Sequence, residues 1–191
     1  MKWILGLASV FFAFAVSANT AAPVTGQISW TGTGVGKAHT GTLKLKSGEL
    51  QLNGKQVVGG KFVFDMSSID YKNPKLVGHL KSPDFFEVEK FPEASFVATK
   101  VEALPKPAAG APTHKITGDL TIRGTTAPIT FDAIVAENGK TLTAKGDIVI
   151  PDRTAYGIKY NSKKFFDVAK LGDKLIEDQI KISLDVAAVL K

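Results

Sequence analysis

Apolar and polar residues alternate along most of this chain. Between residues 115 and 122 the even positions are apolar or glycine and the odd positions are polar, and the same alternation runs from 180 to 186. Shorter stretches at Leu43–Leu45 and Val58–Met66 repeat it. A period of two with one apolar face is typical of a strand that buries one side. Such patterns predict about eight strands between residues 19 and 191.

Two Asn-Gly pairs mark points where the chain reverses. Asn53-Gly54 and Asn138-Gly139 each lie between two strand patterns. Both residue types tolerate the positive φ angles of a two-residue hairpin turn, so the strands that they join are predicted to be antiparallel. The stretch Leu104–Thr113 is rich in proline and alanine and is interpreted as a longer connector, because strands of the same kind flank it.

One region departs from the strand pattern. Between Tyr71 and Pro92, the pairs Asn73-Pro74 and Ser82-Pro83 each offer a capping side chain followed by a proline suited to the first helical position. The sequence therefore predicts a short helix over Pro74–Lys81, a further turn near Pro83–Phe86, and a helical insertion near residues 73–90 as a whole.

The strand count predicts an all-β domain with the architecture of an eight-stranded antiparallel barrel. Open sheet edges invite unwanted pairing, and closing the sheet removes them. Eight strands enclose just enough room for side chains or for one ligand. A sandwich of two sheets satisfies the same pattern and is the structural alternative.

The first 18 residues have the layout of a cleavable secretory signal. Lys2 precedes an almost wholly apolar run from Trp3 to Val16, and Val16-Ser17-Ala18 supplies small residues at a cleavage site. The run is shorter than the roughly 20 residues that a spanning helix needs. We therefore expect residues 19–191 to form one mature domain, in the periplasm or else outside the cell. The chain has no cysteine, which excludes disulfides and a lipoprotein anchor.

Charge and candidate chemistry give little support to an enzyme. The net charge of +6 is scattered, which with export argues against nucleic acid. Gly32–Lys37 lacks the first glycine and the final Ser or Thr of a phosphate loop and is predicted to be a flexible loop between strands. The histidines His39, His79 and His114 are far apart, and no activated-serine motif is present. Neither catalytic residues nor a metal or cofactor site is predicted.

Three longer motifs carry a resemblance to a known family. Residues 78–92 read GHLKSPDFFEVEKFP, residues 118–124 read GDLTIRG, and residues 152–158 read DRTAYGI. Together they resemble the YceI-like family of bacterial periplasmic proteins, over essentially the whole mature chain. The resemblance implies a lipocalin-like eight-stranded barrel that holds a polyisoprenoid lipid, such as a quinone or a polyprenyl phosphate, in its interior.

On this interpretation the protein sequesters or carries an amphiphile, with the lipid tail inside the barrel. Small residues on the inward parity are expected to leave room along the barrel axis; they are Gly118, Ala133, Ala144 and Gly146. For the two glycines the alternative is that they serve strand curvature or close backbone approach. The residues expected to line the tail are Phe62, Phe64, Phe96, Leu120, Phe131, Ala144, Ile148 and Ile150.

The mouth of the barrel is expected to hold the head group. His79, Lys81 and Arg153 are its candidate ligands, with surface charge or local capping as the simpler interpretation. Phe85-Phe86 and Phe165-Phe166 are expected at the mouth, as a ligand gate or as a plug. No nucleic acid and no stable membrane insertion are expected, and a homodimer is possible. The rival hypothesis is an exported barrel with a filled core that acts through protein contacts in stress tolerance.

The leader makes a direct prediction. Cleavage after Ala18 gives a mature chain that begins at Asn19. The intact mass of the protein from a periplasmic fraction will match residues 19–191. A full-length mass found in a membrane fraction would contradict export.

Overall fold

The computed structural model describes residues 19–105 and 107–190, in which eight strands form one closed antiparallel barrel. The expected leader and its cleavage site lie outside these residues. Each strand pairs with its neighbour in sequence, and β1 pairs with β8 to close the circle. The strands are β1 (Thr20–Gly34), β2 (Lys37–Asn53), β3 (Gln56–Asp70), β4 (Glu93–Ala103), β5 (His114–Ile122), β6 (Thr125–Asn138), β7 (Thr141–Ile150) and β8 (Ile176–Val189). The predicted barrel is confirmed, and the sandwich is excluded.

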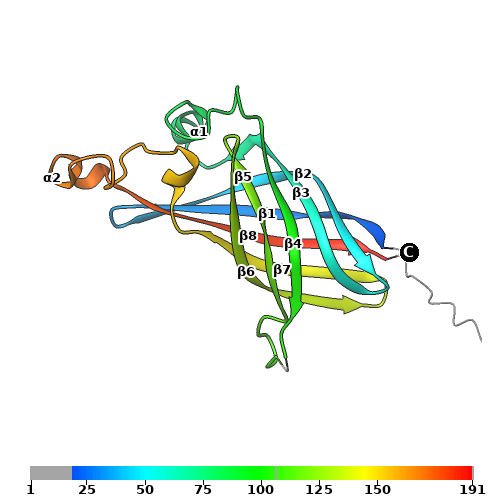
Figure 1. Cartoon of the computed structure of the whole chain (residues 1–191). Helices are drawn as coiled ribbons and strands as arrows, with labels where there is room; N and C mark the ends of the chain where they lie inside the picture. The colour runs from blue at the N-terminus through cyan, green and yellow to red at the C-terminus, as the bar shows by residue number, and fades with distance from the viewer. Residues whose placement is uncertain (1–18, 106, 191) are drawn as a thin grey trace, which may run out of the picture.

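The connections make the two ends of the barrel different (Figure 1). At one end, here called the helical end, the β3–β4 connection contains α1 (Pro74–Lys81), and the β7–β8 connection contains the 3₁₀ turns η1 (Arg153–Tyr156) and η2 (Gly172–Lys174) with α2 (Val168–Leu171) between them. The opposite end, the terminal end, carries Thr20, Val189, two hairpin turns and the connector between β4 and β5.

The local signals in the sequence correspond to the observed elements. Both Asn-Gly pairs form hairpin turns, with φ of 61° at Gly54 and 62° at Gly139. The predicted helix over Pro74–Lys81 is α1, and the side chain of Asn73 caps it by accepting from the N–H of Lys75 and of Leu76. The cap satisfies amide groups that the first helical turn leaves without partners.

Three strands continue beyond the rim of the barrel at the helical end. The last pair between β2 and β3 is Thr42 with Asp70, and the last pair between β7 and β8 is Ile150 with Ile180. Residues 31–34, 37–41 and 176–179 lie past these pairs and form a ribbon, hereafter called the rim ribbon, with β1 in its middle. The glycine-rich stretch expected to be a flexible loop is instead mostly strand, with a two-residue turn at Val35-Gly36.

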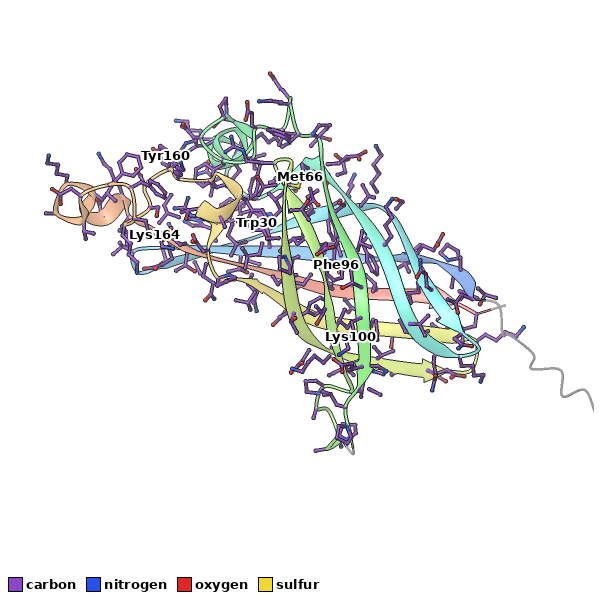
Figure 2. All side chains as sticks on the ribbon, in the orientation of Figure 1. Trp30, Met66, Phe96, Lys100, Tyr160 and Lys164 are labelled. Carbon is purple, nitrogen blue, oxygen red and sulfur yellow. The ribbon has the colours of Figure 1, made fainter. Side chains whose placement is uncertain are left out.

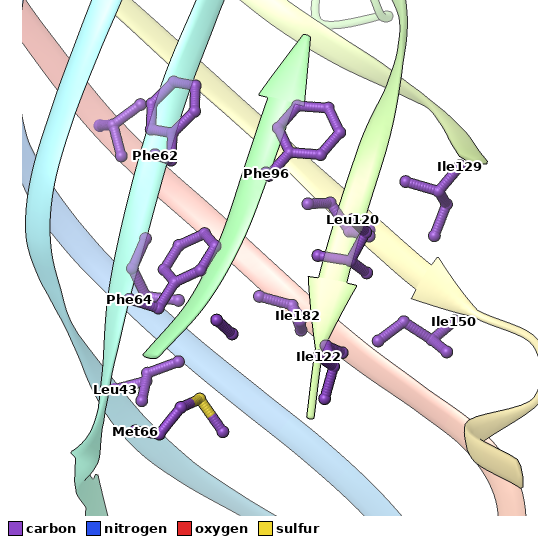
Figure 3. Packing of buried hydrophobic residues seen from close by; sticks show 14 of the residues in the cluster. Leu43, Phe62, Phe64, Met66, Phe96, Leu120, Ile122, Ile129, Ile150 and Ile182 are labelled. Atoms are coloured by element: carbon purple, nitrogen blue, oxygen red, sulfur yellow. The ribbon is translucent and has the colours of Figure 1, made fainter. Parts of the chain in front are cut away.

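The barrel interior is filled in layers by apolar side chains (Figure 3). Phe96 lies between Phe62 and Phe131, with ring centroids 6.4 Å and 5.5 Å away. Three aliphatic side chains of the same core are almost completely buried as well: Leu120, Ile148 and Ile150. Two cavities of about 40 Å³ each remain, one on either side of this aromatic layer. The inward residues expected to line a tail are thus in the core, but no wide channel runs between them.

Gly118 shows why the small inward residues leave so little space. A Cβ atom there would lie 2.3 Å from the carbonyl oxygen of Val97 and 2.5 Å from the ring of Phe96. The ring of Phe96 therefore occupies the space that the glycine leaves. The expectation that Gly118 opens room along the axis is wrong, because glycine serves here for close approach of β4 and β5.

The close packing around Gly118 predicts that even the addition of one methyl group lowers the stability of the fold. Gly118→Ala forces a methyl group against a main-chain oxygen and should lower the free energy of unfolding by about 1–3 kcal/mol. Gly32→Ala is the matched control, because a Cβ atom on Gly32 meets nothing within 4 Å. Urea denaturation of both variants measures the difference, and equal stability would refute the close-packing explanation.

Candidate functional site

A cavity with a mostly apolar lining lies at the helical end, between the rim ribbon and α1. It has a volume of about 280 Å³ and is called the mouth cavity below. Leu76 and Leu80 reach it from α1, Phe85 and Phe86 from the turn that follows, and Trp30 and Ile180 from the barrel wall. Lys37, His39, Asp173, Lys174, Glu177 and Gln179 supply its polar rim. The site therefore combines an apolar floor with a rim that carries both signs of charge.

The mouth cavity continues toward the barrel interior. The inner cavity on the helical-end side of the Phe96 layer is called the upper inner cavity, and the other is the lower inner cavity. Three residues line both the mouth cavity and the upper inner cavity: Trp30, Phe86 and Ile180. Beyond the layer around Phe96, the lower inner cavity is lined by Ala144 and other apolar residues near the terminal end. A line of three apolar spaces thus follows the barrel axis, separated by side chains rather than by backbone. Figure 2 shows Phe96 inside the barrel, nearer to Lys100 than to Tyr160 at the helical end.

Arg123 fixes the segment that carries Phe85 and Phe86. Its guanidinium donates to the carbonyl oxygens of Phe85 (2.7 Å) and Gly157 (3.2 Å) and forms an ion pair with Glu87 at 2.8 Å. Three connections at the helical end, β3–β4, β5–β6 and β7–β8, are tied together by this one side chain. Phe85 is consequently buried, and Phe86 is held against the core at the boundary of two cavities.

Arg153 lies at the base of the mouth cavity and is only 1% exposed. Four N–H groups donate to the carbonyl oxygens of Ile158, Tyr160, Ile176 and Glu177. Burial lowers the pKa of this guanidinium below its ordinary value, and the carboxylates of Asp178 and Asp152 oppose the shift. A guanidinium has five N–H groups, so only one N–H remains that could donate a hydrogen bond to a ligand in the mouth cavity. Its main role is to hold η1 against β8.

The three side chains expected to bind a head group do not converge. Of these, only Arg153 lines the mouth cavity. The ring of His79 lies between those of Phe85 and Tyr160, with centroids 4.9 Å and 4.7 Å away, and its Nε2 is 3.1 Å from Asp84. Lys81 borders a separate surface groove with Ser82 and Glu87–Lys90.

The two aromatic pairs have different environments. Phe85 and Phe86 both line the mouth cavity, whereas Phe165 and Phe166 are 50% and 46% exposed and line none of the cavities described above. The sequence predicts both pairs at the mouth of the barrel, but only one of them lines the mouth cavity. The first pair is at the mouth, and the second projects from the connection between η1 and α2.

Two buried polar groups escaped the sequence interpretation. Trp30 Nε1 and both carboxylate oxygens of Asp178 have no hydrogen-bond partner within residues 19–105 and 107–190. Asp178 instead lies 3.6 Å from Arg153. The burial of Asp178 could have been predicted from the sequence. It lies on the inward-facing side of β8, where the inward-facing residues that follow it are apolar. Its partner could not be identified, since Arg153 is distant in sequence.

The part of the chain that is described contains neither a metal-binding cluster nor a membrane-spanning helix. Over those residues, His, Cys, Asp and Glu side chains form no group of three or more able to hold a metal ion. No helix there is long and apolar enough to cross a bilayer.

Comparisons with known proteins agree with this architecture. The family model for the YceI-like domain matches residues 16–188. A UPF0312 protein of Pseudomonas putida (strain W619) is 45% identical over 62 residues, which cover 32% of this chain and 30% of that protein. A UPF0312 protein of Photorhabdus laumondii is 30% identical over 128 residues, covering 63% of this chain and 57% of that protein. The matches thus span less than two thirds of these relatives.

Solved structures share the barrel. Burkholderia cenocepacia BcnA superposes with a TM-score of 0.68 at 22% identity, covering 85% of this chain and 96% of that chain. A polyisoprenoid binding domain from Saccharophagus degradans, implicated in plant cell wall breakdown, gives 0.64 at 12% identity, covering 90% and 98%. The Campylobacter jejuni YceI protein gives 0.57 at 17% identity, covering 99% and 94%. At these identities the likeness establishes the fold.

The buried ion pair yields a testable prediction. Arg153→Met removes four hydrogen bonds and leaves the carboxylate of Asp178 buried without its cation. Losing one partner of a buried pair costs about 3–5 kcal/mol, and we expect a loss of unfolding free energy of that order. The double variant Arg153→Met with Asp178→Leu should recover part of the loss. A single variant as stable as the wild type would show that Arg153 does not hold this end together.

Proposed function

This chain belongs to the YceI-like domain family, and from that premise we propose that it binds an amphiphilic lipid, with the tail inside the barrel and the head group in the mouth cavity. The lipid we propose is a polyisoprenoid such as a quinone or a polyprenyl phosphate, and the setting is the periplasm. The protein acts as a carrier or store for this lipid and not as an enzyme. The polyisoprenoid binding domain among its structural neighbours supports this choice of ligand class.

The observation that carries the proposal is the line of apolar spaces behind the mouth. The mouth cavity has about 280 Å³, close to the lower limit of about 300 Å³ for ligand pockets. Each CH₂ group transferred from water to such a lining contributes about 0.8 kcal/mol. Several isoprenoid units therefore supply more than enough free energy for a carrier, even after the cost of ordering the tail.

The tail must displace side chains to advance beyond the mouth. The upper inner cavity holds about 40 Å³, and Trp30 and Phe86 stand between it and the mouth cavity. These two side chains act as the gate in our proposal, because both are partly exposed and belong to both linings. The Nε1–H of Trp30 is buried and has no partner among the described residues, so in our proposal it becomes a donor to an oxygen of the head group only once the indole ring moves.

The proposal predicts a bound lipid and a way to block it. Mass spectrometry of an organic extract of the purified protein should detect an isoprenoid lipid in a near-stoichiometric amount. Gly32 lines the mouth cavity, and a Cβ atom there meets nothing within 4 Å. Gly32→Trp should therefore fill the mouth, reduce the extracted lipid at least about tenfold, and leave the melting temperature nearly unchanged.

Gly78→Trp is the matched control. A Cβ atom on Gly78 also meets nothing within 4 Å, but this residue borders the outer groove beside Lys81 and not the mouth cavity. The control should carry as much lipid as the wild type. Empty wild-type extracts, together with no binding of added quinone or polyprenyl phosphate, would favour the rival function of a filled barrel that acts through protein contacts.

A further inference from the structure

The segment from Lys159 to Lys174, here called the basic aromatic loop, exposes an unusual group of side chains. Phe165, Phe166 and Val168 are 50%, 46% and 55% exposed. No other aromatic side chain in the described residues is among the large exposed hydrophobic ones. The same loop carries five lysines and only two aspartates, and all five lysines are exposed. The lysines are Lys159, Lys163, Lys164, Lys170 and Lys174.

The loop has a defined conformation that keeps these side chains outside the core. Its base is tied to the barrel, because Asn161 donates to the carbonyl oxygen of Lys174 at 2.9 Å and accepts from the N–H of Ile176 at 3.0 Å. Ser162 is fully buried, and its carbonyl oxygen accepts from the N–H groups of Phe165 and Phe166. The exposure of the two rings is therefore built into the fold.

The loop also has a defined place beside the mouth cavity. Its last residues, Asp173 and Lys174, line that cavity, and Ile176 just beyond them pairs with Gly34 of the rim ribbon. Figure 1 shows α2 projecting at the same end as α1 and the turn between β1 and β2. Lys37 of that ribbon adds another exposed cation. The loop that carries the exposed rings therefore ends beside the opening through which a lipid would enter, and Lys37 and Lys174 border that opening.

We propose that the basic aromatic loop docks the protein on the surface of an anionic phospholipid membrane. Rings at the boundary between head groups and acyl chains and lysines at the phosphates are the two contributions that hold peripheral proteins on such surfaces. A ring and a cation of this loop lie side by side, since the Nζ of Lys159 is 4.8 Å from the centroid of the Phe165 ring. A protein interface is the less favoured occupant, because interface cores are depleted in lysine.

Docking would bring the mouth cavity against the bilayer. A lipid tail could then pass between membrane and barrel without crossing water, where each exposed CH₂ costs about 0.8 kcal/mol. This consequence rests on the proposed lipid binding, but the docking itself does not, because the exposed side chains Phe165, Phe166 and Val168 line none of the cavities. The two proposals can therefore fail independently.

The test is flotation of the purified chain from Asn19 onward, which contains the whole closed barrel, with lipid vesicles. Binding is expected to vesicles of phosphatidylcholine with phosphatidylglycerol, to be weaker with phosphatidylcholine alone, and to decrease with added salt. The double variant Phe165→Ser with Phe166→Ser should bind about tenfold or more weakly. Lys163→Glu with Lys170→Glu should show a similar loss on the anionic vesicles only.

The controls place similar apolar-to-polar and charge-reversing changes on the surface away from the basic aromatic loop. Val97 and Val149 are 39% and 40% exposed there, and Val97→Ser with Val149→Ser should bind as the wild type does. Lys61→Glu with Lys140→Glu is the corresponding charge control. Melting temperatures of all variants should stay close to that of the wild type, because every changed side chain is exposed.

The possible outcomes separate the proposals. A wild-type protein that ignores anionic vesicles, yet yields lipid in organic extracts, would refute docking and leave the carrier function intact. A protein that binds anionic vesicles but yields no lipid in organic extracts would support docking and refute the carrier function. If the phenylalanine variant binds vesicles normally but converts a dimer to a monomer in size-exclusion chromatography, the loop is a protein interface and the docking proposal is wrong.

Discussion

The pairing of β1 with β8 is the constraint on which the rest of this structure depends. It joins Val24 to Ala188 at one end of the ladder and Gly32 to Ile180 near the rim. Closing the sheet removes both edges and fixes which face of every strand points inward. The enclosed space is narrow, so the inward faces must fill it with layers of side chains such as the one around Phe96.

Unequal strand lengths convert this closed barrel into one with a mouth. Because β1, β2 and β8 pass beyond their outer neighbours, the rim ribbon stands above the barrel on one side, and the helical segments cover the other. Arg123 and Arg153 hold that cover through carbonyl oxygens that the short turns leave free. The mouth cavity is the space between ribbon and cover, and it owes its shape to both.

The interior shows a balance between stability and binding. Aromatic layers close the axis and bury the apolar surface that a chain without cysteine needs for stability. The same layers leave only small spaces on either side, so a long tail can enter only by moving rings aside. Trp30 lies at the boundary between two of these spaces, and its buried Nε1–H has no hydrogen-bond partner among the described residues, which is unfavourable for stability.

Sequence alone determined the elements whose causes are local. The period of two, the Asn-Gly turns at Gly54 and Gly139 and the helix that follows Asn73 depend on neighbouring residues, and all three predictions are confirmed. Tertiary structure decided what depends on distant partners. The ring of Phe96 fills the space at Gly118, Arg153 is buried beside Asp178, Lys81 faces another groove, and Phe165 stays exposed. Each outcome follows from strand register and from how the connections fold over the rim, and these long-range contacts cannot be inferred from residue types and spacing within one segment.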